Sequence, residues 1–125
     1  MPLTTDRNTS RIEGTLFSFE AGAPVYAGSM ACLNAEGKLV PASITVGLTS
    51  VVGVVQRQAR VGERVEVRRG VFNYTGKSGD TPELPQVGSI CYVADDAVVQ
   101  KTAAENAPVA GTVMDVNDMG VWVRI

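Results

Sequence analysis

The sequence has no histidine and only two cysteines among its 125 residues. Without histidine, the Ser-His and Cys-His nucleophile arrangements are excluded, and the commonest metal ligand is missing. The two isolated cysteines, Cys32 and Cys91, cannot supply the paired spacing of a zinc site. They fit buried thiols in a reducing compartment better than a disulfide framework. We therefore expect a protein that is not an enzyme, with no catalytic residue, no metal and no cofactor.

Clustered positive charge and long apolar runs are also missing. The net charge is −2, which argues against a general phosphate-binding surface. The densest basic segment, residues 57–69, is interrupted by Glu63 and Glu66 and is typical of solvated strand faces. No segment approaches the roughly 20 apolar residues that span a bilayer, and residues 1–10 lack the apolar stretch of a signal peptide. We expect neither nucleic acid nor a membrane as a partner, and synthesis in a cytoplasm.

The residues that are present favour β-structure. Apolar residues make up 45% of the chain but aromatic residues only 6%, so Val, Ile, Leu and Ala must fill most of the core. Arg64–Arg68 alternates polar and apolar side chains, the period of a half-buried strand. Gly120–Ile125 is a second β-rich run. The one helical turn that we expect is Thr102–Asn106, which Pro108 stops.

Turn signals separate the apolar runs at short intervals. Asn34–Gly37, Asp95-Asp96 and Asn117–Gly120 each have the residues of a tight turn. Short strands with frequent turns indicate a sandwich or a small barrel. We predict an all-β fold, a small single-domain barrel or sandwich of short antiparallel strands with little helix, over residues 16–125. Residues 1–15 are polar and predict an N-terminal arm, and Thr75–Gln86 predicts a long surface loop.

One order of features occurs twice along the chain. Gly28-Ser29 is followed by an apolar strand, a turn, a short strand, a loop and a strand that contains Gly53. Gly88-Ser89 opens the same order, which ends in a strand that contains Gly111. Two related β-units with a central hairpin between them predict a pseudo-symmetric barrel. This alignment places Cys32 and Cys91 on opposite strand faces, which disfavours a disulfide.

Taken together, the order of these segments resembles the capsid cement (head decoration) proteins of tailed bacteriophages, over about residues 20–125. The segments are 25–30, 39–42, 52–54, 65–72, 87–96 and 109–111, with the closing Asp-Val-x-Asp-x-Gly-Val-Trp-Val pattern of residues 115–123. The resemblance implies a small β-barrel-like domain on the outer surface of the virion head, made in the cytoplasm of the bacterial host. It also implies that the protein stabilises contacts between subunits of the major capsid protein, acts as a dimer or trimer and has no catalytic residues.

Two regions are candidates for contacts with partners. The polar arm could add a strand to an exposed sheet edge of the capsid, and we assign it the residues Pro2, Leu3, Thr4, Thr5, Arg7, Arg11 and Ile12. The arm hypothesis extends over Pro2–Phe19, although Leu16, Phe17 and Phe19 could equally form the first core strand. The Thr75–Gln86 loop is the second candidate contact surface. Candidate subunit-interface residues are Phe72, Tyr74, Pro82 and Leu84.

Two alternatives remain open at this point. One is another structural β-barrel of the virion, such as a tail-tube or head-completion subunit, which would form rings. The other is a small barrel that binds a ligand or nucleic acid through Arg68, Phe72 and Tyr74, which are spaced to share one strand face. We interpret the two aromatic residues as core or interface residues instead, because large aromatic side chains dominate such burial.

Overall fold

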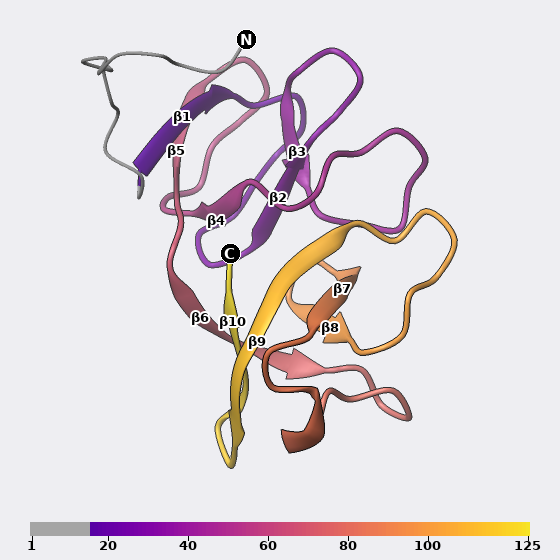
Figure 1. The fold of residues 1–125 in the computed structure, drawn as a ribbon. Helices are drawn as coiled ribbons and strands as arrows, with labels where there is room; N and C mark the ends of the chain where they lie inside the picture. The colour runs from indigo at the N-terminus through magenta and orange to yellow at the C-terminus, as the bar shows by residue number, and fades with distance from the viewer. Residues whose placement is uncertain (1–15) are drawn as a thin grey trace, which may run out of the picture.

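The structure is a computed structural model that describes residues 16–125 as strands joined by short connections (Figure 1). The all-β class predicted from the sequence is confirmed, and the predicted arm lies outside the described residues. The elements are β1 (Leu16–Glu20), β2 (Met30–Leu33), β3 (Leu39–Pro41), β4 (Gly53–Val55), β5 (Arg64–Arg68), β6 (Val71–Gly76), the 3-10 helix η1 (Leu84–Gln86), β7 (Ile90–Asp95), β8 (Val98–Gln100), β9 (Val109–Asn117) and β10 (Gly120–Arg124).

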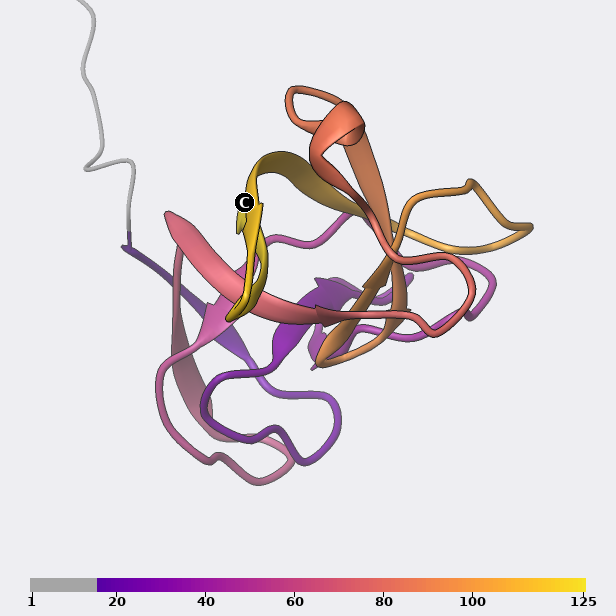
Figure 2. The same cartoon turned by 90° about the horizontal axis from the view of Figure 1, so that it is seen from below.

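The strands form two sheets that follow one another along the chain. The first, here the N-terminal sheet, has five strands in the order β1-β5-β4-β2-β3, and the second is a closed barrel in the order β10-β6-β8-β7-β9. All strand pairs are antiparallel except β6 and β8, which close the barrel in parallel. In Figure 1 the N-terminal sheet occupies the upper part of the molecule and the barrel the lower part, and Figure 2 shows the pair from below.

The two sheets are copies of one five-stranded unit. Strands β1 to β5 correspond in chain order to strands β6 to β10. When each strand in the order β1-β5-β4-β2-β3 is replaced by its counterpart, the result is β6-β10-β9-β7-β8, which is the order of the closed barrel read in the other direction. The register corresponds as well: Ala31 pairs with Gly53 in the N-terminal sheet, and Cys91 pairs with Gly111 in the barrel. The internal repeat predicted from the sequence between β2–β4 and β7–β9 is therefore confirmed, and it extends to the remaining strands.

Backbone hydrogen bonds repeat in the same places. The Gly28 amide donates to the Val55 carbonyl at 2.8 Å, and the Gly88 amide donates to the Val113 carbonyl at 2.8 Å. Both glycines have a φ near +90°, a conformation that costs glycine little and other residues much more. The repeated Gly-Ser dipeptides of the sequence thus mark the same strand entry in both units.

The ends of the repeated unit also correspond. Tyr74 pairs with Val121 in the barrel as Phe19 pairs with Val65 in the N-terminal sheet. In the barrel, β6 and β8 are joined in parallel at Gly76 and Val99. The equivalent positions of the N-terminal sheet form a single parallel bridge between Ala21 and Leu39. The N-terminal sheet is thus a less completely closed version of the barrel.

The predicted central hairpin is wrong. Strands β5 and β6 are consecutive, but β5 pairs with β1 and β4 whereas β6 pairs with β10 and β8. Arg68 ends β5 before the break at Arg69-Gly70, so it does not share a strand face with Phe72 and Tyr74. Alternation predicts that a segment is a strand, but it does not determine the partner of that strand.

Two further local predictions need correction. Thr102–Asn106 has a bend at Thr102 and a turn at Glu105-Asn106 rather than a helical turn, because so short a segment gains too few hydrogen bonds to offset helix nucleation. Asn106 instead has a φ of 63°. The predicted surface loop Thr75–Gln86 begins inside β6 and ends in η1. The three predicted turns, by contrast, connect β2 to β3, β7 to β8 and β9 to β10 as expected.

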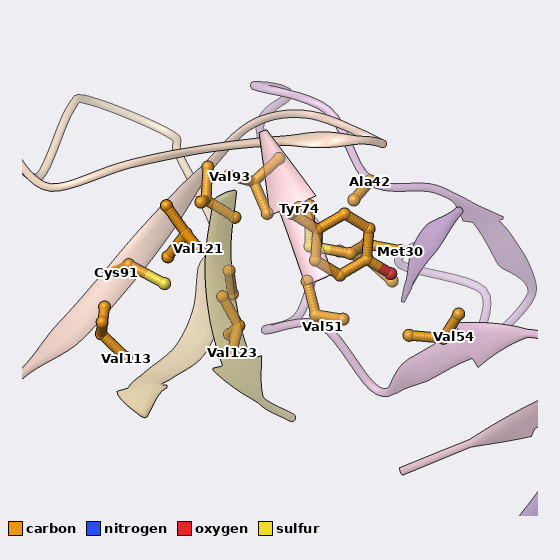
Figure 3. Close-up of a cluster of buried hydrophobic side chains, with 13 residues drawn as sticks. Met30, Ala42, Val51, Val54, Tyr74, Cys91, Val93, Val113, Val121 and Val123 are labelled. Atoms are coloured by element: carbon orange, nitrogen blue, oxygen red, sulfur yellow. The ribbon is translucent and has the colours of Figure 1, made fainter. Parts of the chain in front are cut away.

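Buried side chains form two clusters. The smaller one, here the N-terminal core, lies inside the N-terminal sheet and consists of Ala21, Val25, Ala31, Leu39, Val55, Ala59, Val65 and Val67. The larger one, here the shared core, combines side chains from both units (Figure 3): Met30, Cys32, Ala42, Val51, Val54, Tyr74, Cys91, Val93, Val99, Ala110, Val113, Val121 and Val123. The barrel interior is therefore completed by side chains of the N-terminal unit.

Both cysteines belong to the shared core and are free thiols. Cys32 follows Ala31 in β2, and successive side chains of a strand point to opposite faces of the sheet. Because Ala31 faces the N-terminal core, Cys32 lies on the outer face of its sheet. Cys91 occupies the position equivalent to Ala31 and faces the barrel interior. The predicted placement on opposite strand faces is confirmed, and the two residues share a core because the outer face of one unit packs against the interior of the other.

Candidate interaction surface

The four predicted interface residues divide into two buried, one half-buried and one exposed. Tyr74 is 6% exposed and belongs to the shared core, as one of the two interpretations from the sequence expected, and Pro82 is fully buried within the chain, so neither presents its side chain to solvent. Phe72 is half-buried against the shared core. Leu84 alone projects into solvent, with an exposed fraction of 63%.

The loop that carries Leu84 is fixed to the barrel by polar contacts. The Asp80 carboxylate accepts hydrogen bonds from the Thr102 amide at 3.0 Å and the Thr102 hydroxyl at 2.8 Å. These bonds hold the pKa of Asp80 below its usual value. At the start of η1, the Glu83 amide donates to Gln86 Oε1 at 2.8 Å. With Pro82 buried next to it, the loop presents Leu84 on a rigid support.

Leu84 is part of a larger exposed apolar surface, which we call the apolar face. Helix η1 packs against β9, and the bond from Gly88 to Val113 holds the following segment along the same strand. Ile90 pairs with Thr112 on β9. The side chains of the apolar face, all more than a third exposed, are Leu84, Val87, Ile90 and Met114. In Figures 1 and 2, η1 lies on the side of the barrel away from the N-terminal sheet.

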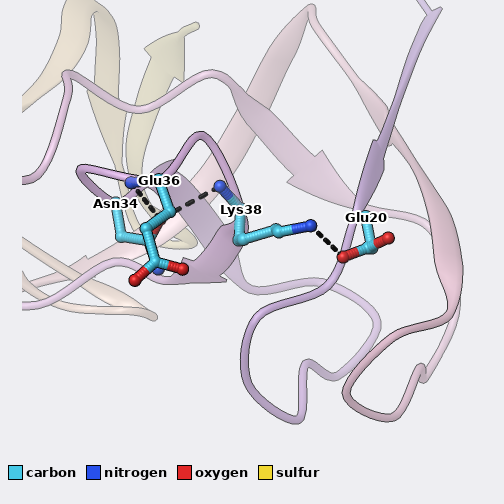
Figure 4. Close-up of polar contacts among 4 residues, drawn as sticks. All are labelled: Glu20, Asn34, Glu36 and Lys38. Carbon is cyan, nitrogen blue, oxygen red and sulfur yellow. Dashed lines mark hydrogen bonds and ion pairs between the residues drawn. The ribbon is translucent and has the colours of Figure 1, made fainter.

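The opposite end of the molecule carries a polar hairpin tip between β2 and β3 (Figure 4). Asn34 Oδ1 accepts hydrogen bonds from the backbone amides of Glu36 and Lys38, both at 3.0 Å. The Lys38 ammonium forms an ion pair with Glu20 at the end of β1. The hydrogen bond from Lys38 holds the pKa of Glu20 below its usual value. This network fixes the tip against β1 and leaves the Glu36 side chain in solvent.

The buried thiols are poorly suited to nucleophilic chemistry. Burial raises the pKa of Cys32 to about 12 and that of Cys91 to about 11, so both are protonated at neutral pH, whereas the thiolate is the reactive form. Within residues 16–125, no three Asp, Glu or Cys side chains converge as a metal ion requires. No helix in the same range has the length and apolarity needed to cross a membrane.

The N-terminal site prediction lies mostly beyond the described residues. Its seven named residues fall in the range 1–15, which the structure does not describe. Leu16, Phe17 and Phe19 form part of β1, and Phe17 and Phe19 pack against the N-terminal core. The alternative that this segment forms the first core strand is therefore correct for Phe17 and Phe19, whereas Leu16 is exposed. The arm hypothesis keeps only the segment before residue 16.

Comparisons with models of known protein families and with curated protein sequences found no match to this chain.

Proposed function

We propose that the protein is a cement, or decoration, protein of a tailed-bacteriophage head. In this role it binds the outer surface of the capsid and stabilises contacts between subunits of the major capsid protein. The apolar face carries the proposal as a surface for contacts with protein subunits, because exposed apolar side chains gathered around one strand are typical of such sites. The resemblance of the segment order to head decoration proteins supports the same function.

The fold suits a role in which contacts rather than chemistry matter. Its apolar side chains are presented by a closed barrel, so little conformational entropy is lost when a partner binds. A protein that acts as a dimer or trimer gains further affinity when several sites engage one shell. The chain is mildly acidic, which suits the outer surface of a container whose DNA lies inside.

We assign capsid binding to the polar arm that precedes β1. An extended segment can add to an exposed sheet edge, where backbone hydrogen bonds supply affinity and few side chains need to match.

Co-sedimentation with undecorated heads of the phage that encodes the chain tests this function. We expect the full-length protein to pellet with the heads at a saturating, fixed ratio, and a variant lacking residues 2–15 to remain in the supernatant. The matched control carries residues 2–12 in shuffled order, which keeps the length and composition of the arm. Absence of binding by the full-length protein would contradict the function, whereas undiminished binding of the deletion variant would contradict only the role of the arm.

A further inference from the structure

Equivalent positions of the two repeated units differ in exposure in a systematic way. The outer face of β2 and β4 is covered by the barrel, and the outer face of β7 and β9 is not. Met30 is fully buried, whereas its counterpart Ile90 is 53% exposed. Cys32 and Val54 are buried, and their counterparts, Tyr92 and Thr112, are half-buried. The same side of the unit is thus an internal contact in one copy and a free surface in the other.

At the surface that covers Met30, the difference in exposure is reversed: the barrel residues are buried, and their counterparts in the N-terminal sheet are more exposed. This surface is one end of the barrel, where Tyr74, Val93 and Ala110 are buried in the shared core. The Met30 amide donates to the Asp96 carbonyl there at 2.8 Å. The equivalent end of the N-terminal sheet, which we call the open end, has half-buried or exposed residues at the corresponding positions: Phe19, Leu33, Val52 and Glu36.

These two differences concern the same contact. Each unit has both the outer face and the end that form it, but within one chain the contact is made only once. Within the chain, the outer face of the N-terminal unit sits on the end of the barrel. Among residues 16–125, no segment covers the second outer face or the second open end, which lie at opposite ends of the described part of the chain. The longer connection between β6 and β7 adds Leu84 and Val87 to the uncovered outer face, which enlarges its apolar area relative to the covered one.

We propose that the apolar face of one copy of this protein binds the open end of the N-terminal sheet of a second copy. The contact repeats between chains the packing of the two units within a chain. It joins two different surfaces, so successive copies associate head to tail and form a ring where the rotation closes. This inference concerns self-association alone, and it stands or falls without any capsid.

Solution mass of the full-length chain, by light scattering after size exclusion, tests the contact. We expect the unmodified chain to be larger than a monomer. Ile90→Arg places a charge on the apolar face, and Glu36→Trp places a bulky ring at the open end, so each variant alone should be monomeric. Val71→Arg is the matched control: Val71 is exposed on β6, outside both surfaces, and this variant should keep the mass of the unmodified chain.

Mixing the two monomeric variants distinguishes a head-to-tail contact from a symmetric one. Glu36→Trp retains an intact apolar face and Ile90→Arg retains an intact open end, so an equimolar mixture should form a complex of two chains and stop there. A mixture that stays monomeric overturns the proposal, as does a monomeric unmodified chain. Dimers of Glu36→Trp alone would assign the apolar face to a symmetric contact and also overturn it. Met114→Glu replaces Ile90→Arg if circular dichroism shows that the latter fails to fold.

Discussion

The Tyr74 hydroxyl donates a 3.1 Å hydrogen bond to the Gly28 carbonyl and thereby ties the barrel to the N-terminal unit. Burial, together with the nearby Asp96 carboxylate, raises the pKa of Tyr74 well above its ordinary value. The phenol therefore stays a hydrogen-bond donor wherever the protein is folded. The bond joins the first β-turn of one unit to the core of the other.

Removal of this hydroxyl should weaken the junction between the units. We expect Tyr74→Phe to lower the free energy of unfolding by about 1 kcal/mol, the usual contribution of one hydrogen bond whose partner is left unpaired. Urea titration followed by circular dichroism measures the change. Tyr26→Phe is the matched control, because Tyr26 is 56% exposed, and it should change stability by less than about 0.5 kcal/mol. Equal effects of the two variants would show that the bond to Gly28 contributes nothing.

The repeated glycines of β4 and β9 should both resist substitution, and Gly111 more strongly. A Cβ atom at Gly111 would lie 2.3 Å from the Arg124 carbonyl oxygen, whereas at Gly53 it would first meet the Val67 side chain at 2.8 Å. A side chain can move aside more easily than strand backbone can. We expect Gly111→Ala to destabilise by about 3 kcal/mol and Gly53→Ala by about 1 to 2 kcal/mol, the range found for overpacking.

Thermal unfolding of both glycine variants checks this order. Thr112→Ala, on the outer face of the same strand, is the control and should cost at most about 1 kcal/mol. A smaller loss at Gly111 than at Gly53 would contradict the close backbone approach.

The thiols should be unreactive until the protein unfolds. Because burial raises the pKa of Cys32 and of Cys91 above the reference value of 9.0, we expect negligible labelling by a thiol-specific disulfide reagent at pH 8. Both residues should be labelled in denaturant. Rapid labelling of one thiol in the native protein would place that residue at the surface, contrary to the shared core.

The same shifts predict that stability falls in alkali. Each thiol loses its proton more easily in the unfolded chain, so its contribution is complete below pH 9 and declines as the pH rises toward the folded pKa of about 11 or 12. The midpoint of urea unfolding should therefore decrease from pH 9 upward. Cys91→Ala, which restores the residue of the equivalent position 31, should flatten this decrease, and an unchanged slope would contradict the link.

The hairpin tip at Asn34 should be sensitive to loss of its side-chain oxygen. Asn34 Oδ1 serves two backbone amides, so Asn34→Ala should lower the free energy of unfolding by about 1 to 2 kcal/mol. Asn34→Asp keeps the acceptor and should retain most of the stability. Differential scanning calorimetry of the two variants measures the difference, and similar melting temperatures would argue against the role of Oδ1.

The sequence allowed the strands and the inner part of the repeat to be predicted, but not the full repeat. Gly28 and Gly88 need a positive φ, and Gly53 and Gly111 have no room for a Cβ atom, so these positions keep glycine and reveal the equivalence of β2–β4 and β7–β9. Strands β1 and β6 share an aromatic-polar-aromatic pattern, Phe17-Ser18-Phe19 and Phe72-Asn73-Tyr74, which is too short to stand out from ordinary alternation of apolar and polar residues. Such alternation is common to most half-buried strands, and it hides their relationship.

The candidate surface was only partly predictable for a related reason. Tyr74 and Leu84 are both large and apolar, and composition gives no indication that one is buried and the other exposed. Their exposure depends on which unit packs against which end of the barrel, a contact between residues far apart in the chain. Met30 and Ile90, at equivalent positions, differ in the same way.

The shared core also has a consequence for how the chain unfolds. Its side chains come from both units, so separating the units would expose the barrel interior and remove the cover from Met30. The barrel would lose part of the packing of its interior, whereas the N-terminal unit would keep its own core but lose the cover of its outer face. Despite its duplicated architecture, the molecule should melt in one cooperative transition, and a fragment cut at Gly70 should not fold independently.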